Sequence, residues 1–149
     1  MSAEDGFTSL SETRLAIIGL GLMGGSLALA LRGHCRELLG IDTNADTLSL
    51  ARQRGIADHL DTTPLHLLPQ ADLIILATPV KAILSLLKEL PNLHSGRAVI
   101  LDLGSTKGDI MQAMAELPQR FDPVGGHPMC GKEKSGLAEA DSQIYQGVP

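Results

Sequence analysis

The sequence predicts an α/β fold in which a mainly parallel, doubly wound sheet carries helices on both faces. From Arg14 onward, short apolar runs alternate with segments of helical period, the rhythm typical of parallel strand–helix–strand units. The expected strands are almost continuously apolar, as strands are when helices cover both faces of their sheet. The 149 residues suit a single domain of this kind.

Each element follows from a local pattern and from the residue that ends it. Strands are expected over 14–19, 37–42, 71–79, 97–104 and 121–128, with a less regular one near 57–60. Helices are expected over 22–33, 45–55, 80–90 and 106–117, with a helical turn near 64–68. Residues 1–13 are polar and are interpreted as a flexible leader, which leaves 14–149 as one domain.

Composition excludes several classes of function. The net charge is −5 and no stripe of Lys and Arg is present, so nucleic-acid binding is not expected. No apolar run approaches the roughly 18 residues of a membrane span, and the polar start is not a signal peptide, so no membrane association is expected. The two cysteines, Cys35 and Cys130, show no CxxC pattern, which indicates a reduced, cytoplasmic setting.

A glycine-rich turn lies between the first strand and the first helix. Gly19, Gly21 and Gly24 form a G-x-G-x-x-G pattern, which is weak alone but indicates a dinucleotide site in this context. Gly19 permits the turn, Gly21 lets the backbone approach a pyrophosphate, and Gly24 lets helix and strand pack closely. The first helical N–H groups, at Leu22 and Met23, are expected to face the phosphates. An ordinary glycine-rich turn is the alternative to this Rossmann-type interpretation.

An acidic residue ends the second strand. Asp42 lies 23 positions after Gly19, where the dinucleotide pattern places an acid that bonds the ribose hydroxyls. A carboxylate repels the 2′-phosphate of NADP, and residues 43–46 offer no cation, so NAD is the expected cofactor. The alternative is that Asp42 only caps the next helix, although Asn44 is the better cap candidate.

Three later strand ends carry unusual residues: Thr78-Pro79, the run from Gly104 to Lys107, and His127-Pro128. Because the carboxyl ends of parallel strands share one edge, these residues are expected to face the same crevice. Oxidation of an alcohol requires removal of the hydroxyl proton, and a histidine with its ordinary pKa near 6.5 suits that task. We therefore expect His127 to be catalytic and Ser105 to orient it or to bond the same hydroxyl, the alternative being a structural histidine.

The segment after His127 is compatible with more than one role. His127 and Cys130 could begin a metal site, but no second ligand pair follows, so no metal is expected. Cys130 could be a nucleophile paired with His127, although a packing role is favoured. The run Lys132-Glu133-Lys134 is either a solvated loop or part of a site for an anionic substrate.

Taken together, the motifs resemble the prephenate/arogenate dehydrogenase family of tyrosine biosynthesis. The matching pieces are "IIGLGLMGGSLALAL" (17–31), "ILATPV" (75–80), "LDLGSTKGDI" (101–110) and "GGHPMCGKEKSG" (125–136). The resemblance implies NAD-dependent oxidation of prephenate or arogenate with loss of carbon dioxide. By the same resemblance, His127 accepts a hydrogen bond from the ring hydroxyl, Ser105 bonds that hydroxyl and the histidine, and Glu133 helps to control access. Lys132 departs from the small residue expected there.

The family also carries a second, helical domain that forms a homodimer and supplies cations for the substrate carboxylates. The chain ends at "YQGVP" (145–149), so the resemblance predicts an N-terminal fragment that lacks this domain and the dimer. Two different functions remain possible: another β-hydroxyacid or imine-type dehydrogenase, and a dinucleotide-binding module without catalysis.

Overall fold

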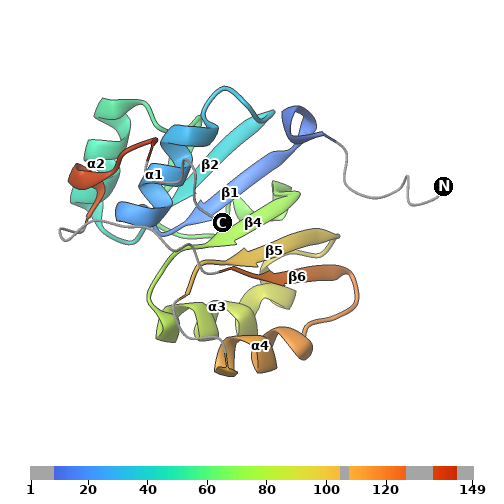
Figure 1. Cartoon of the computed structure of the whole chain (residues 1–149). Coiled ribbons are helices and arrows are strands. Elements are labelled where there is room, and N and C mark those ends of the chain that lie inside the picture. The colour runs from blue at the N-terminus through green and yellow to red at the C-terminus, as the bar shows by residue number, and fades with distance from the viewer. Residues whose placement is uncertain (1–8, 105–107, 127–135, 144–149) are drawn as a thin grey trace.

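The computed structural model describes residues 9–104, 108–126 and 136–143, and within them it forms a six-stranded parallel sheet flanked by helices (Figure 1). The strands are β1 (Arg14–Ile18), β2 (Glu37–Ile41), β3 (His59–Asp61), β4 (Leu73–Leu76), β5 (Ala98–Asp102) and β6 (Phe121–Gly125). The helices are α1 (Leu22–Leu31), α2 (Ala45–Arg54), α3 (Val80–Leu93) and α4 (Gly108–Ala115), with short 3-10 helices η2 (Leu10–Glu12), η3 (Leu68–Gln70) and η4 (Leu137–Glu139). The predicted fold class is confirmed.

The strand order is β3-β2-β1-β4-β5-β6, so the chain moves outward from β1 in one direction and then, from β4, in the other. Every strand pair is parallel. The order therefore reverses between β1 and β4, and ligands of such sheets bind beyond the carboxyl ends of the strands at that point.

Alternate residues of the four inner strands, β2, β1, β4 and β5, pack into two separate cores. In β1, Leu15 and Ile17 pack with α1, α2 and η4, whereas Ala16 and Ile18 pack with α3 and α4. Figure 1 shows the same division, with α1 and α2 on one face of the sheet and α3 and α4 on the other. Burial on both faces explains why the strands are almost continuously apolar.

Helix α3 is longer than the sequence indicates. The prediction ended it at residue 90, yet the helix continues through Pro91 to Leu93. Leu90 and Leu93 are both buried in the core, so packing of the last turn outweighs the missing bond. Residues 10–12, expected in a flexible leader, form η2, and Leu10 packs against the core.

The edge strand β6 is protected against addition of another strand. Ala98 donates its N–H to Arg120 O at 3.3 Å, and Gly126 donates to Asp102 O at 2.9 Å, so the even-numbered peptide groups of β6 turn toward β5. Pro123 occupies an odd position, which faces outward, and a proline has no N–H to offer there.

Residues 136–143 lie against α1 and α2, which the sequence does not predict. Arg54 donates to Leu137 O at 2.9 Å and to Ala140 O at 3.3 Å, and Asp141 donates its N–H to the buried Ser26 hydroxyl at 2.8 Å. The Leu137 side chain fills the space that a side chain at Gly25 would occupy. These contacts hold the segment 136–143 against α1.

Candidate functional site

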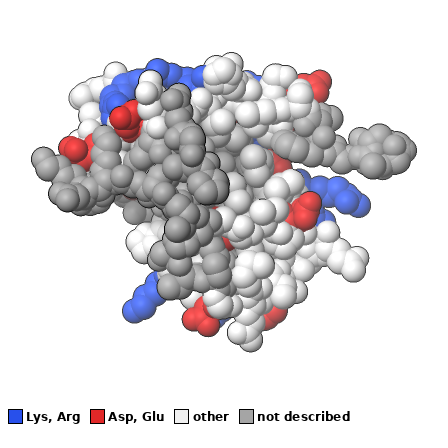
Figure 2. All heavy atoms as spheres, in the orientation of Figure 1, with Lys and Arg blue, Asp and Glu red and all other residues white. Residues whose placement is uncertain are grey.

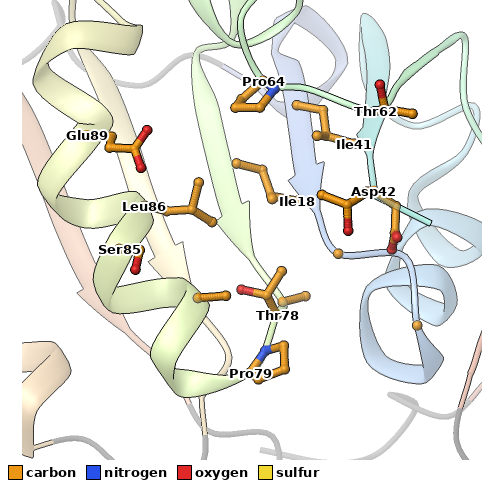
Figure 3. A pocket seen from close by; sticks show the side chains of 15 residues that line it. Ile18, Ile41, Asp42, Thr62, Pro64, Thr78, Pro79, Ser85, Leu86 and Glu89 are labelled. Atoms are coloured by element: carbon orange, nitrogen blue, oxygen red, sulfur yellow. The ribbon is translucent and has the colours of Figure 1, made fainter.

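A cavity of about 570 Å³ opens at the carboxyl edge of the sheet, where the strand order reverses (Figure 3). Its walls come from the ends of β1, β2 and β4, from the turn after β3, and from one side of α3. Five of the predicted cofactor residues line it: Gly19, Gly21, Asp42, Thr78 and Pro79. Parallel strands thus bring together residues that lie up to 60 positions apart.

The glycine turn has the backbone geometry that its three glycines were predicted to allow. Gly19 has φ +99°, and a Cβ there would lie 2.6 Å from Ala77 O. A Cβ on Gly24 would overlap the carbonyl oxygen of Gly19. Gly21 has no atom within 4 Å of its Cβ position, so its open side is free for a ligand to approach the backbone.

Helix α1 begins at this turn without a side-chain cap. Its N-cap residue is Gly21, which has no side chain to cap the helix. Leu22 and Met23 form the start of the helix but do not line the cavity. An uncapped helix start carries a partial positive charge and N–H groups directed outward, which suits phosphate oxygens.

Asp42 is fixed beside the glycine turn. Its Oδ2 accepts the N–H of Leu20 at 2.8 Å, and its Oδ1 accepts the N–H of Asn44 at 2.9 Å. The cap of α2 is Asn44, whose side chain accepts the N–H of Thr47 at 3.0 Å. The alternative in which Asp42 serves as the helix cap is therefore wrong, and its carboxylate lies on the cavity wall.

The end of β4 contributes a polar atom without a partner. The hydroxyl oxygen of Thr78 is buried and makes no hydrogen bond to the described residues, while Thr78 itself lines the cavity. An unsatisfied buried hydroxyl is unfavourable by about 1–3 kcal/mol. A ligand group that bonds this hydroxyl would therefore be stabilised.

The outer wall was not predicted from the sequence. Thr62 and Pro64 form one part of it, and Asp61 shapes their turn by accepting the N–H groups of Thr62 and Thr63 at 2.7 and 3.3 Å. The side-chain hydrogen bond from His66, at 2.9 Å, holds the pKa of Asp61 below its usual value. The carboxylate thus stays ionised and retains its bonds to the turn.

Helix α3 forms the other part of the outer wall with Ala82, Ser85, Leu86 and Glu89. Their i, i+3, i+4, i+7 spacing defines one helical face, adjacent to the stripe that packs in the core. The spacing is visible in the sequence, but it indicates a cavity wall only when the position of α3 beside β4 is known.

The predicted catalytic and substrate-loop residues, Ser105, His127, Lys132 and Glu133, lie outside the described residues. Cys130 does too, so the structure does not bear on the possible metal and thiol roles. Gly104 and Gly126, the residues just before Ser105 and His127, are described, and they follow the carboxyl ends of the neighbouring strands β5 and β6.

Charge on the described surface is mixed. Lys and Arg gather along the upper edge of the face in Figure 2, and Asp and Glu are scattered over it. The Arg32 guanidinium donates hydrogen bonds to the carbonyls of Arg54 and Gly55 at the end of α2. Within the described ranges, no helix has both the length and the apolar character needed to cross a membrane.

The fold and this cavity define the class of protein: a Rossmann-type nucleotide-binding domain. The family model "Prephenate dehydrogenase, nucleotide-binding domain" matches residues 27–149, and the chain belongs to this family. The glycine turn precedes the matched residues, so its assignment rests on its geometry and on the longer matches to individual proteins.

Those matches extend over most of the chain. The prephenate dehydrogenase of Bacillus subtilis is 37% identical over 140 residues, which cover 90% of this chain and 37% of that protein. The structure of A. aeolicus prephenate dehydrogenase in complex with hydroxyphenyl propionate and NAD+ superposes with a TM-score of 0.83 at 35% identity, over 95% of this chain and 50% of the other. Synechocystis arogenate dehydrogenase gives a TM-score of 0.83 at 32% identity, over 91% and 48% of the two chains. The chain thus spans half or less of the length of these relatives.

Proposed function

We propose that the chain is the NAD-binding part of a dehydrogenase that oxidises prephenate or arogenate and releases carbon dioxide, a step of tyrosine biosynthesis. The proposal is supported by the family match and by the A. aeolicus relative, whose complex contains NAD+ and hydroxyphenyl propionate. The Bacillus subtilis and Synechocystis relatives carry the names prephenate and arogenate dehydrogenase.

The observation that carries the proposal is the cavity at the carboxyl edge. It combines a helix start at a glycine N-cap, a turn with open backbone at Gly21, and the fixed carboxylate of Asp42. These groups match the pyrophosphate and the ribose hydroxyls of NAD. The carboxylate disfavours the extra phosphate of NADP, and the unpartnered Thr78 hydroxyl offers a further bond.

The chemistry is assigned to residues that follow the ends of β5 and β6. Bound NAD supplies the acceptor for the hydride that leaves the ring carbon bearing the hydroxyl. His127 accepts the hydrogen bond of that hydroxyl and, as a general base, takes its proton as the carbonyl forms. Ser105 orients the imidazole, and Glu133 and Lys132 contribute to the substrate side of the site.

The proposal includes a second part of the protein. Since the relatives are about twice as long as this chain or longer, we assign to that part the groups that bind the substrate carboxylates and the homodimer contact. We place the enzyme in the cytoplasm, in keeping with two cysteines that lack disulfide or metal spacing.

The test is turnover in a joined polypeptide, defined as this chain followed by the part of the Bacillus subtilis relative that lies beyond the matched region. NADH formation from prephenate and from arogenate is measured by absorbance. We expect turnover with at least one substrate, and His127→Asn should lower kcat by about 10²–10⁴-fold, the range for loss of a general base.

The matched control is His59→Asn, because His59 is an exposed histidine at the amino end of β3, bonded to Glu37 at 3.0 Å. It should leave kcat unchanged, and both variants should bind NAD as the parent does. If His127→Asn retains kcat within a few-fold, His127 is not the catalytic base. No turnover of the parent polypeptide with either substrate would contradict the proposed function.

A further inference from the structure

Asp102 is a buried acidic residue that the mechanism above does not use. It is the last residue of β5 and its exposed fraction is 0%. A carboxylate is unfavourable in such a position unless hydrogen bonds stabilise it. Its surroundings therefore indicate what it does.

The side chain of Asp102 holds the turn that leaves β5. Its Oδ2 accepts the N–H of Gly104 at 3.0 Å, the bond that Asp makes with the residue two positions on in an Asx turn. A Cβ on Gly104 would lie 3.2 Å from the same oxygen and 2.7 Å from Ile110 Cδ1. The turn is thus packed onto the carboxylate with no room for a side chain, and Ser105 is the next residue in the chain.

The peptide carbonyl of Asp102 holds the turn that leaves β6. It accepts the N–H of Gly126 at 2.9 Å, and a Cβ on Gly126 would lie 3.0 Å from this oxygen. Gly125, the last residue of β6, is paired with Asp102 in the parallel register. His127 follows Gly126 directly.

We propose that Asp102 is a positioning residue that fixes the turn before Ser105 relative to the turn before His127. The inference rests on the proposed function, which assigns the chemistry to these two residues. The Gly104 bond fixes the Asp102 side chain and thereby the orientation of the peptide group that Gly126 bonds. Reacting groups displaced by about 1 Å can lose about 10²-fold in rate, so one residue that bonds both turns has a direct effect on catalysis.

Amide hydrogen exchange of this 149-residue chain, followed by NMR, tests the coupling without any substrate. In Asp102→Ala, exchange of the Gly104 amide should accelerate about tenfold, as expected for one lost hydrogen bond. Exchange at Gly126 should accelerate by a smaller factor, while Leu15 and Ile75 in the sheet stay unchanged. Asp102→Asn keeps an oxygen in the same place and should retain most of the protection.

Two results of this experiment would overturn the proposal. If Gly126 is unaffected in Asp102→Ala, Asp102 does not couple the turns. If amide exchange at Leu15 and Ile75 accelerates as much as at Gly104, Asp102 only stabilises the whole fold. The matched control is Asp58→Ala, which removes a carboxylate that accepts the Leu38 N–H at 2.7 Å near the opposite edge of the sheet, and which should affect Leu38 alone.

Kinetics of the joined polypeptide test the link to catalysis. Asp102→Ala should lower kcat by about 10²-fold with an unchanged Kd for NAD, and Asp102→Asn should restore most of it. Because the Gly104 bond positions Ser105 directly, Asp102→Ala combined with Ser105→Ala should lose less than the sum of the two single losses. Fully additive losses, or an equal loss in Asp102→Asn, would contradict positioning by this bond. If the parent lacks turnover, the proposed function fails, while the exchange experiment still decides whether Asp102 couples the turns.

Discussion

The two edges of the sheet both bury polar side chains, but those side chains have different partners. At the amino edge, His94 is 4% exposed; its Nε2 lies 2.8 Å from Ala71 O, and its Nδ1 accepts the N–H of Gly96 at 3.1 Å. At the carboxyl edge, the Thr78 hydroxyl has no partner among the described residues and the start of α1 has no side-chain cap. Polar groups bonded to protein indicate a structural role, whereas groups that face a cavity are available to a ligand.

The amino edge is closed further by Arg120. Its Nη2 donates to the carbonyls of Pro91 and His94, both at 2.9 Å, and its guanidinium lies 4.6 Å over the ring of Phe121. The His94 ring meets the same phenylalanine edge-on at 5.9 Å. This cluster connects the end of α3 to the start of β6 through contacts within the protein.

Gly24→Ala should have the largest effect on stability and NAD binding, because it disrupts the close packing at the carboxyl edge. The added Cβ would overlap the Gly19 carbonyl oxygen, so the glycine turn or α1 must move. We expect a loss of about 1–3 kcal/mol in the free energy of unfolding, typical of overpacking, together with loss of NAD binding by calorimetry.

Gly108→Ala is its control, since none of the described residues places an atom within 4 Å of that Cβ position and α4 begins there. Its stability and its Kd for NAD should match those of the parent. A normal Kd in Gly24→Ala would show that the glycine turn is not the site of the dinucleotide.

His94→Leu should reduce the stability of the protein but leave its binding of NAD unchanged. The substitution leaves the Ala71 carbonyl and the Gly96 N–H without their partner. Ala71 is buried, and an unsatisfied buried group costs about 1–3 kcal/mol. Urea unfolding measures the loss, and calorimetry with NAD measures the binding. The exposed His34, replaced in the same way, should change neither quantity. A weakened Kd in His94→Leu would mean that the two edges are not independent.

The sequence predicted the sheet, both layers of helices and the position of Asp42, Thr78 and Pro79 at one edge, because apolar runs and turn residues are local patterns. It did not predict the buried position of His94, because that position depends on the Ala71 carbonyl, 23 residues earlier in the chain. The segment 136–143 was also missed, because its position depends on Arg54 and Ser26, which are distant in the chain. The part of the cavity wall formed by Ser85 and Glu89 could not be predicted either, because it depends on where α3 packs on the sheet.

The smallest expected effect concerns the choice between NAD and NADP. Asp42→Ala would remove the bond to the Leu20 N–H as well as the charge, and so would disturb the glycine turn. Asp42→Asn removes the charge and the bond from the Asn44 N–H but retains an oxygen acceptor for Leu20 in the glycine turn, which makes it the sharper variant. The parent chain should bind NAD more tightly than NADP, because a carboxylate at this position repels the 2′-phosphate. In Asp42→Asn the ratio of the two dissociation constants should narrow by about tenfold, a difference of about 1.4 kcal/mol.

Calorimetry with both cofactors at fixed ionic strength measures this ratio, and the melting temperature shows whether the turn is intact. If the parent binds NADP more tightly, or if the ratio is unchanged in a variant with normal stability, the Asp42 charge does not set the cofactor.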